Sequence, residues 1–329
     1  MKEKKSFYVG FDTSNYTTSM AACDESGKII ANVKMPLPVK EGNRGLRQSD
    51  AVFLHVKNFT EMYGKFKKAI EGYGDLIAVG ASDKPRSCEG SYMPCFLVGY
   101  TSSLAYSQNA DVPSYTFSHQ DGHVMAALYS ASNPEGERVP MEMERIMRAP
   151  FAAFHVSGGT TELLYVDPTG DDFKIEKLGG TDDLNAGQAI DRIGVKMGLK
   201  FPCGAEMECL ARENNEKLPP RKLSVKGFSC SLSGLENLAE RVYSTTENKS
   251  LTSAFVFEYV AEALGRLTDN LRVEYPGIPV IYAGGVMSNK IIQNRLAAKE
   301  NVYFADSQFS ADNAAGVALL CRRRHLENK

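Results

Sequence analysis

The sequence predicts an α/β protein made of two similar lobes with a nucleotide site between them. The main observation is that three predicted strands each end at a short loop of small or polar residues. These strands with their loops are 7–11 with 12–16, 151–156 with 157–161, and 278–283 with 284–289. Glycine turns next to a helix N-terminus favour a bound phosphate or ribose. A chain of 329 residues is also long enough for two lobes with separate cores.

The first lobe is predicted to begin with a β-meander, and the same unit recurs later in the chain. Residues 6–34 are typical of three strands joined by a polar loop at 12–16 and a turn at 24–27. Residues 151–170 repeat the order of a strand, a small polar loop, two threonines, a strand and a turn. This similarity predicts a duplicated fold.

The loop of the second unit is the central candidate for ligand binding. Residues 157–161 read Ser-Gly-Gly-Thr-Thr. Two adjacent glycines let the backbone approach a ligand closely, and successive amides can point at one anion. The segment therefore predicts a phosphate cradle, with an ordinary β-hairpin as the alternative. After the third strand, Gly284 and Gly285 precede Ser288 and Asn289, either of which can cap the next helix.

Helical periodicity predicts four further helices, at residues 51–71, 95–107, 252–274 and 311–325. The charged segment 132–148 is predicted to be an inter-lobe connection or an exposed loop, and residues 217–227 are predicted to be a basic loop.

Two histidines stand one helical turn apart after the strand predicted at 114–117. Ser118 can cap the helix that follows, which places His119 and His123 on the same face. Two imidazoles at this spacing suit a divalent metal ion, and two surface histidines are the alternative. Near the C-terminus, Asp312 places a carboxylate at a predicted helix start, where a plain helix cap is the simplest role.

The composition limits the class of protein. Hydrophobic residues make up 43% of the chain and charged residues 24%, as in soluble globular proteins. The net charge of −2 argues against extensive coating of nucleic acid but allows a local basic patch. The seven cysteines include no CxxC pair and predict reduced thiols in a cytoplasmic protein, although Cys88 and Cys95 could bridge. No stretch predicts a signal peptide or a membrane span.

Taken together, these motifs resemble those of the tRNA threonylcarbamoyladenosine-synthesis family, formerly named glycoprotease or O-sialoglycoprotein endopeptidase. The resemblance covers nearly the whole chain and rests on the order and spacing of residues 10–14, 119–123, 156–161, 185–191, 201–204, 233–235, 283–289 and 312–315. It implies an actin-like, sugar-kinase-like ATPase fold with a nucleotide and metal cleft between two lobes. The implied lobes are residues 1–118, with the C-terminal helix 311–329 at the lobe junction, and residues 119–310.

The activity that the resemblance implies is acyl transfer to tRNA. The family transfers a threonylcarbamoyl group from threonylcarbamoyl-AMP to the exocyclic amine of an adenosine next to the anticodon. The implied partners are an adenine nucleotide (threonylcarbamoyl-AMP, ATP or ADP), a transiently bound tRNA and protein subunits of a threonylcarbamoylation complex, without a membrane. One alternative is a non-catalytic paralogue that binds nucleotide and metal as a partner subunit. Another is the metalloprotease of the older family name.

The roles of individual residues are implied by position. His119, His123 and Asp312 would hold one divalent ion, Fe or Zn, with His155 as a candidate fourth ligand. A hydrogen bond of His155 within the sheet is the alternative. The residues implied to bind the nucleotide are Ser157, Gly158, Gly159, Thr160, Asp191, Gly204, Gly284, Gly285 and Asn289, and Asp12 is a candidate catalytic carboxylate.

Several positions differ from the family pattern. Residues 15–17 are Asn-Tyr-Thr where the family has cysteine and two acidic residues, and Glu236 replaces a lysine. Residues 83–90 replace a Gly-Pro-Gly loop. These changes lie around the acyl acceptor, which keeps the partner-subunit alternative open. Candidate contacts to tRNA phosphates, with solvated surface charge as the alternative, are Arg221, Lys222, Lys226 and residues 322–324.

Overall fold

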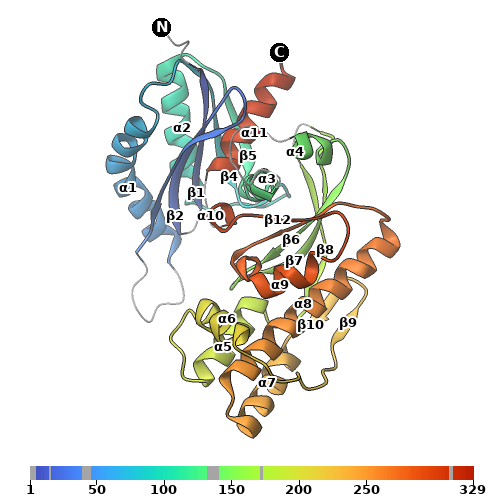
Figure 1. Ribbon diagram of the computed structural model, residues 1–329. Coiled ribbons are helices and arrows are strands. Elements are labelled where there is room, and N and C mark those ends of the chain that lie inside the picture. Colours follow the sequence, from blue (N-terminus) through green and yellow to red (C-terminus); the bar gives the residue numbers. More distant parts are fainter. Residues whose placement is uncertain (1–4, 15, 39–45, 132–140, 171–172, 311–313) are drawn as a thin grey trace. The chain divides into compact units, whose positions relative to one another are not determined.

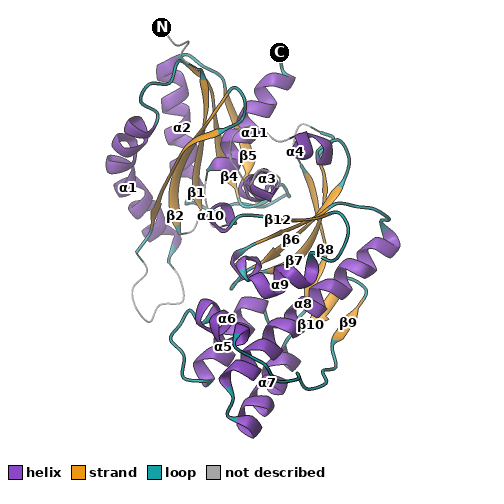
Figure 2. Cartoon of the chain, viewed as in Figure 1, coloured by secondary structure: helices purple, strands orange, loops and turns teal. Residues whose placement is uncertain are grey.

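The computed structural model describes residues 5–14, 16–38, 46–131, 141–170, 173–310 and 314–329 (Figure 1). The chain divides into two compact units. Unit 1 comprises Met1–Arg148, Pro168–Lys174 and Gln308–Lys329, and unit 2 comprises Ala149–Asp167 and Ile175–Ser307. Each unit contains one β-sheet with helices packed against it, so the predicted α/β class is confirmed (Figure 2). The lobes implied at residues 1–118 and 119–310 remain a prediction.

The sheet of unit 1 has five strands in the order β3-β2-β1-β4-β5. Its strands are β1 (Phe7–Ser14), β2 (Thr17–Asp24), β3 (Ile29–Pro36), β4 (Leu76–Lys84) and β5 (Ser114–Ser118). Strands β1, β2 and β3 form the predicted antiparallel meander, and β4 and β5 continue the sheet in parallel. The polar loop predicted at 12–16 was wrong in extent, because β1 continues to Ser14, which pairs with Thr17. Asp12 and Thr13 tolerate this burial because their side chains are bonded inside; Thr13 Oγ1, for example, donates to the carbonyl of Cys95 at 2.9 Å.

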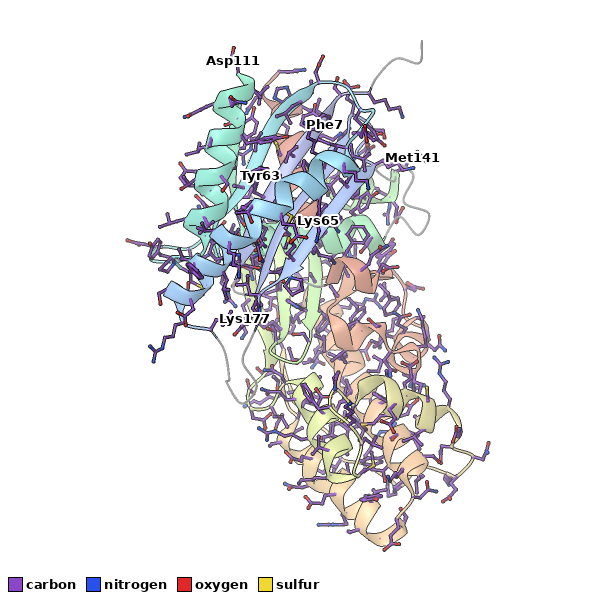
Figure 3. All side chains as sticks on the ribbon, turned by 90° about the vertical axis from the view of Figure 1, so that its left-hand side faces the viewer. Phe7, Tyr63, Lys65, Asp111, Met141 and Lys177 are labelled. Carbon is purple, nitrogen blue, oxygen red and sulfur yellow. The ribbon has the colours of Figure 1, made fainter. Side chains whose placement is uncertain are left out.

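Strand β1 is buried along its whole length because helices cover both of its faces. Helices α1 (Gln48–Ala69) and α2 (Phe96–Ala110) pack on the face that carries Phe7 and Phe11, and Figure 3 shows α1 with Tyr63 on this side of the sheet. Tyr63 stacks on Tyr106 of α2. The opposite face of β1 packs against α11 (Ala315–Glu327), where a Cβ on Gly10 would overlap the α11 backbone. Because side chains alternate along a strand, Asp12 lies on the same face as Gly10.

The remaining helices of unit 1 are α3 (His119–Ala131) and α4 (Met141–Ile146). Helix α3 packs against α11. The exposed loop predicted at 132–148 was wrong for its second half, because Met143 and Ile146 are buried one turn apart and form α4. Residues 132–140 lie outside the described residues, as do residues 311–313, where the last helix was predicted to begin.

Unit 2 repeats the strand order of unit 1. Its seven-stranded sheet has the order β12-β11-β6-β7-β8-β10-β9. The strands are β6 (Phe151–Val156), β7 (Thr161–Asp167), β8 (Lys174–Thr181), β9 (Ser224–Lys226), β10 (Ser229–Ser231), β11 (Val280–Ala283) and β12 (Val302–Phe304). In unit 1, β1 pairs antiparallel with β2 and parallel with β4; in unit 2, β6 pairs antiparallel with β7 and parallel with β11, so β12-β11-β6-β7-β8 repeats the order β5-β4-β1-β2-β3 and β10 and β9 are added at one edge. The predicted duplication is therefore confirmed.

The helices of unit 2 surround the long, largely buried α8 (Lys249–Glu274). The others are α5 (Ala186–Lys196), α6 (Gly204–Arg212), α7 (Ser233–Thr246), the 3₁₀ turn η1 (Gly285–Ser288) and α9 (Lys290–Leu296), and a short α10 (Ser307–Ser310) follows. The basic loop predicted at 217–227 was partly wrong, because residues 224–226 pair with β10 as strand β9. None of the helices in the described ranges combines the length and apolarity needed to cross a membrane.

Alanine at Gly316 should destabilise unit 1. A Cβ on Gly316 of α11 would overlap the carbonyl oxygen of Gly122 on α3, so the two helices could not keep their contact. We expect the free energy of unfolding to fall by roughly 2–3 kcal/mol. The control is alanine at Gly64 of α1, whose Cβ would meet nothing within 4 Å. That change should raise stability by about 0.5–1 kcal/mol, and equal effects of the two variants in urea denaturation would contradict the packing.

Candidate functional site

His119 and His123 are neighbours at the start of α3. The predicted cap is confirmed, since the amide of Asp121 donates to Ser118 Oγ at 3.1 Å. The amide of Ser118 in turn donates to Asp121 Oδ2 at 3.0 Å, which completes a reciprocal cap. The two imidazole ring centroids lie 4.3 Å apart, and the angle between the ring planes is 76°. The helix therefore presents both rings together.

Asp12 fixes the orientation of His119. Asp12 Oδ2 accepts a hydrogen bond from His119 Nδ1 at 2.5 Å, and the carboxylate is 1% exposed. A carboxylate bonded to one ring nitrogen holds the ring and directs the other nitrogen to a metal ion. Two neighbouring imidazoles, one of them oriented by a carboxylate, fit Zn²⁺ or Fe²⁺ better than Mg²⁺. This contact makes Asp12 a positioning residue for His119, and its catalytic role stays a prediction.

The remaining predicted metal ligands are not brought to the pair in the part of the chain that the structure describes. Within that part, no three or more histidine, cysteine, aspartate or glutamate residues form a group that could hold a metal ion. Asp312 lies outside the described residues. His155 belongs to unit 2, where it lies on β6 opposite Glu162 and beside Ala283 of β11. Both therefore stay predicted ligands.

The glycine turn between β6 and β7 is the connection of a β-hairpin. Val156 pairs with Thr161, and the amide of Ser157 donates to the carbonyl of Thr160 at 2.7 Å. The amide of Thr160 donates to Ser157 Oγ at 3.1 Å. Gly158 and Gly159, between them, are exposed. The segment therefore has the geometry of a hairpin, the alternative to the phosphate cradle, and it carries two exposed glycines at its tip.

The N-terminus of α5 lies directly against this turn. The amide of Gly187 donates to the carbonyl of Ser157 at 3.2 Å, and a Cβ on Gly187 would overlap the backbone of Gly158. A capping box of Asn185 and Gln188 holds the first turn of α5. Because a helix N-terminus carries partial positive charge, this position favours an anion.

A pocket of about 620 Å³ opens beside the turn in unit 2, a size suited to a small-molecule ligand. Its lining residues are Gly158, Gln188, Asp191, Arg192, Val195, Lys196, Phe201 and Glu236. The predicted nucleotide residues Gly158 and Asp191 thus share one pocket. Asp191 Oδ1 also accepts from the amide of Cys203 at 2.8 Å, which fixes the start of α6 at Gly204.

Contacts within the chain explain why glycine is required at only some of the positions predicted to bind the nucleotide. Gly284 has φ +102°, and a Cβ there would overlap the carbonyl oxygen of Val156. A Cβ on four others would meet nothing within 4 Å, and none of these has a left-handed φ; they are Gly158, Gly159, Gly204 and Gly285. Folding does not require glycine at these four positions, and the space in front of them is open to a ligand.

Asn289 has a structural partner of its own. Its Oδ1 accepts from the amides of Ile291 and Ile292, both at 3.0 Å, so it is the predicted cap of α9. The residue is 6% exposed. Its contact with a ligand stays a prediction.

Asp183 links the start of α7 to the segment that leads into α5, a structural role that the sequence analysis missed. Partial burial acts to raise the pKa of its carboxyl, but hydrogen bonds from Ser231, Ser233 and the amides of Leu184 and Leu232 outweigh burial and hold this pKa well below its usual range. The carboxylate thereby fixes the N-terminus of α7 next to the segment that leads into α5. The only signal was an aspartate in a turn, and its partners lie about fifty residues away.

Most of the candidate basic contacts to tRNA are bonded within the protein. Arg221 pairs with Glu262 at 2.8 Å and with Glu258 at 3.6 Å. The arginines of α11 likewise bond inside unit 1; Arg322, for example, donates to the carbonyl of Glu25 at 2.9 Å. Lys222 and Lys226 are exposed and remain candidates.

Residues 55–319 match the family model described as tRNA N6-adenosine threonylcarbamoyltransferase (TsaD). The protein of that name from Thermus thermophilus is 30% identical over 325 residues, which cover 96% of this chain and 92% of the relative. The one from Latilactobacillus sakei is 28% identical over 313 residues, which cover 91% and 83%.

Solved structures show the same fold at low sequence identity. HypF from T. kodakarensis aligns with a TM-score of 0.59 and 13% identity, over 99% of this chain and 48% of that one. A ROK family glucokinase from Streptomyces griseus aligns with a TM-score of 0.50 and 13% identity, over 96% and 99%. The predicted actin-like, sugar-kinase-like ATPase fold is therefore confirmed.

Asparagine at Asp12 should weaken metal binding. The change keeps the shape of the side chain but removes the charge that holds His119 Nδ1, so we expect metal affinity to fall about 10–100-fold. Metal content after dialysis against Zn²⁺ or Fe²⁺ measures this effect. Asp50→Asn, in the exposed first turn of α1, is the control. Full metal content in Asp12→Asn would overturn the role of Asp12.

Stability should fall at mildly acid pH because of His55. This buried side chain of α1 bonds through Nδ1 to Thr18 Oγ1 at 2.8 Å, and burial lowers the pKa of the imidazole from 6.5 to about 4. As the pH falls, the imidazole is therefore protonated near pH 6.5 in the unfolded chain but only near pH 4 in the folded chain. We expect the free energy of unfolding to fall by up to about 3 kcal/mol across this interval. In His55→Gln this part of the slope should vanish, and an unchanged slope would contradict the assignment.

Alanine at Gly159 should weaken nucleotide binding without weakening the fold. A methyl group there meets no atom of the chain within 4 Å, so stability should change by less than about 0.5 kcal/mol, whereas AMP affinity should fall at least about tenfold. Gly284→Ala is a control in which stability should fall, because a Cβ there would overlap the carbonyl oxygen of Val156 and destabilise unit 2. Calorimetric AMP titration and urea denaturation separate the two effects; unchanged AMP affinity in Gly159→Ala would exclude the turn as a ligand site.

Proposed function

Because the chain belongs to the tRNA N6-adenosine threonylcarbamoyltransferase family, we propose that it transfers a threonylcarbamoyl group from threonylcarbamoyl-AMP to the exocyclic amine of a tRNA adenosine. The observation that best supports this proposal is the turn at residues 157–160. Its exposed glycines face open space, the N-terminus of α5 lies against it, and a pocket of about 620 Å³ opens beside it.

The turn would bind the phosphate that leaves. In the reaction, the adenosine N6 attacks the carbamoyl carbon, the bond between this carbon and the phosphate oxygen breaks, AMP departs, and N6 loses one proton. Amides of the turn and the positive end of α5 would stabilise the negative charge on the departing phosphate. The donor is already activated, so the reaction needs no protein nucleophile. Asp191 and Gly204 would bind the ribose or adenosine part.

His119 and His123 would hold one divalent ion, with Asp12 orienting His119. When bound, such an ion supplies a Lewis acid that polarises the carbamoyl carbonyl. Asp312 and His155 are the proposed additional ligands. The adenosine of the tRNA would have to be turned out of its stack to react. Lys222 and Lys226 are proposed contacts to the tRNA backbone, and other protein subunits of a cytoplasmic threonylcarbamoylation complex are proposed partners.

A reconstituted reaction tests the proposal. The purified protein is incubated with tRNA, threonine, bicarbonate, ATP and an enzyme that forms threonylcarbamoyl-AMP, and the nucleosides are then analysed by mass spectrometry. We expect threonylcarbamoyladenosine to form, to fall at least about tenfold with Gly159→Ala, and to stay unchanged with Gly64→Ala. If no product forms although the protein binds AMP, the partner-subunit alternative replaces the transferase.

A further inference from the structure

One wall of the pocket is a compensated group of charges between α5 and α7. Arg192 and Lys196 stand one turn apart on α5 and both reach Glu236 on α7, at 3.3 Å and 3.1 Å. Lys196 also pairs with Glu240 at 2.7 Å. Arg192, Lys196 and Glu236 line the pocket, and Glu240 is not among its lining residues. Asp191 also lines the pocket, so the two cations and two carboxylates of the lining sum to zero charge.

Glu236 is the fixed member of this group. Its side chain is 19% exposed, whereas those of Arg192 and Lys196 are 57% and 43% exposed. A largely buried carboxylate that accepts from both cations holds them, and it stays ionised because they surround it. Without it, Arg192 would lose its carboxylate and Lys196 would keep only Glu240, which is not among the lining residues, so the lining would carry an excess of positive charge. Such side chains would attract phosphate groups.

We propose that Glu236 sets the charge preference of this pocket, so that it accepts a ligand with one phosphate group and disfavours a polyphosphate. The inference rests on the proposed function for the identity of the ligand, an adenine nucleotide monophosphate or its acyl derivative. One phosphate is bound by the glycine turn. A second or third phosphate finds no uncompensated cation on the wall and is repelled by Glu236. Specificity of this kind comes from a group that opposes the wrong ligand as well as from groups that bind the right one.

Titration of the purified protein with AMP, ADP and ATP in a buffer free of magnesium tests the inference. We expect the wild-type protein to bind ADP and ATP no more tightly than AMP. In Glu236→Gln, Arg192 loses its carboxylate partner and Lys196 keeps only Glu240 outside the pocket lining, so ATP should bind about tenfold more tightly. AMP affinity should change less than about twofold, which also shows that the variant is folded. The gain for ATP should shrink as salt is added.

Matched variants separate the pocket wall from a general charge effect. Glu240→Gln removes the same charge from the same ion-pair group but outside the pocket lining, and it should leave the ratio of ATP to AMP affinity unchanged. In the Glu236→Gln background, Arg192→Gln with Lys196→Gln should abolish the gain for ATP. An unchanged ratio in Glu236→Gln overturns the inference, as does a wild-type protein that already prefers ATP by more than about tenfold.

The transfer assay keeps this inference distinct from the proposed function. If no threonylcarbamoyladenosine forms but Glu236→Gln shifts the ratio of affinities, the inference stands and the transferase proposal fails. If product forms and the ratio does not move, the inference alone fails. If neither the wild-type protein nor Glu236→Gln binds any of the three nucleotides, both fail.

Discussion

The buried hydrogen bond between Asp12 and His119 is the constraint on which the candidate site of unit 1 depends. A carboxylate on a strand covered by helices on both faces is stable only if its oxygens are bonded. The amide of Ser14 donates to one oxygen and His119 to the other. The contact therefore ties the end of β1 to the first turn of α3, and it sets the orientation of the imidazole that a metal would need. The glycine contacts of α11 with β1 and α3 keep these elements close enough for the bond to form.

The two units have the same strand order but different chemistry at the turn after the first strand. In unit 1 Ser14 pairs with Thr17, so only two residues separate the strands, and β1 contributes buried polar side chains instead of a loop. In unit 2 Val156 pairs with Thr161, so four residues separate the strands, two of them exposed glycines. The two additional residues allow backbone amides to face solvent next to α5. A duplicated framework thus supports a side-chain site in one unit and a backbone site in the other.

Local sequence patterns predicted several of the elements and two helix caps, but not the contacts between distant segments. The caps Ser118 and Asn289 and the adjacent pair His119 and His123 follow from helix geometry, and all were predicted correctly. The bond from Asp12 to His119 joins residues 107 apart, and the pair of Arg192 with Glu236 joins residues 44 apart. Such contacts depend on the order of strands in the sheet and on how the helices pack, which periodicity and capping do not determine. The loop predicted at 12–16 failed for the same reason, because its polar residues find partners only in the folded unit.

The glycines of unit 2 separate the requirements of folding from those of a ligand. Gly187 and Gly284 are needed by the chain, since a side chain at either position would overlap the backbone of β6 or of its turn. Gly158, Gly159, Gly204 and Gly285 are not needed in this way. Each glycine without a packing reason makes the unfolded chain more flexible and lowers stability by about 0.4–1 kcal/mol relative to alanine. No packing contact at these four positions offsets this loss of stability. Gly64 of α1 has the same open space, so open space alone does not identify a ligand site. Gly158 and Gly159 differ because they form the turn beside the pocket, where a ligand that approaches the backbone closely would account for them.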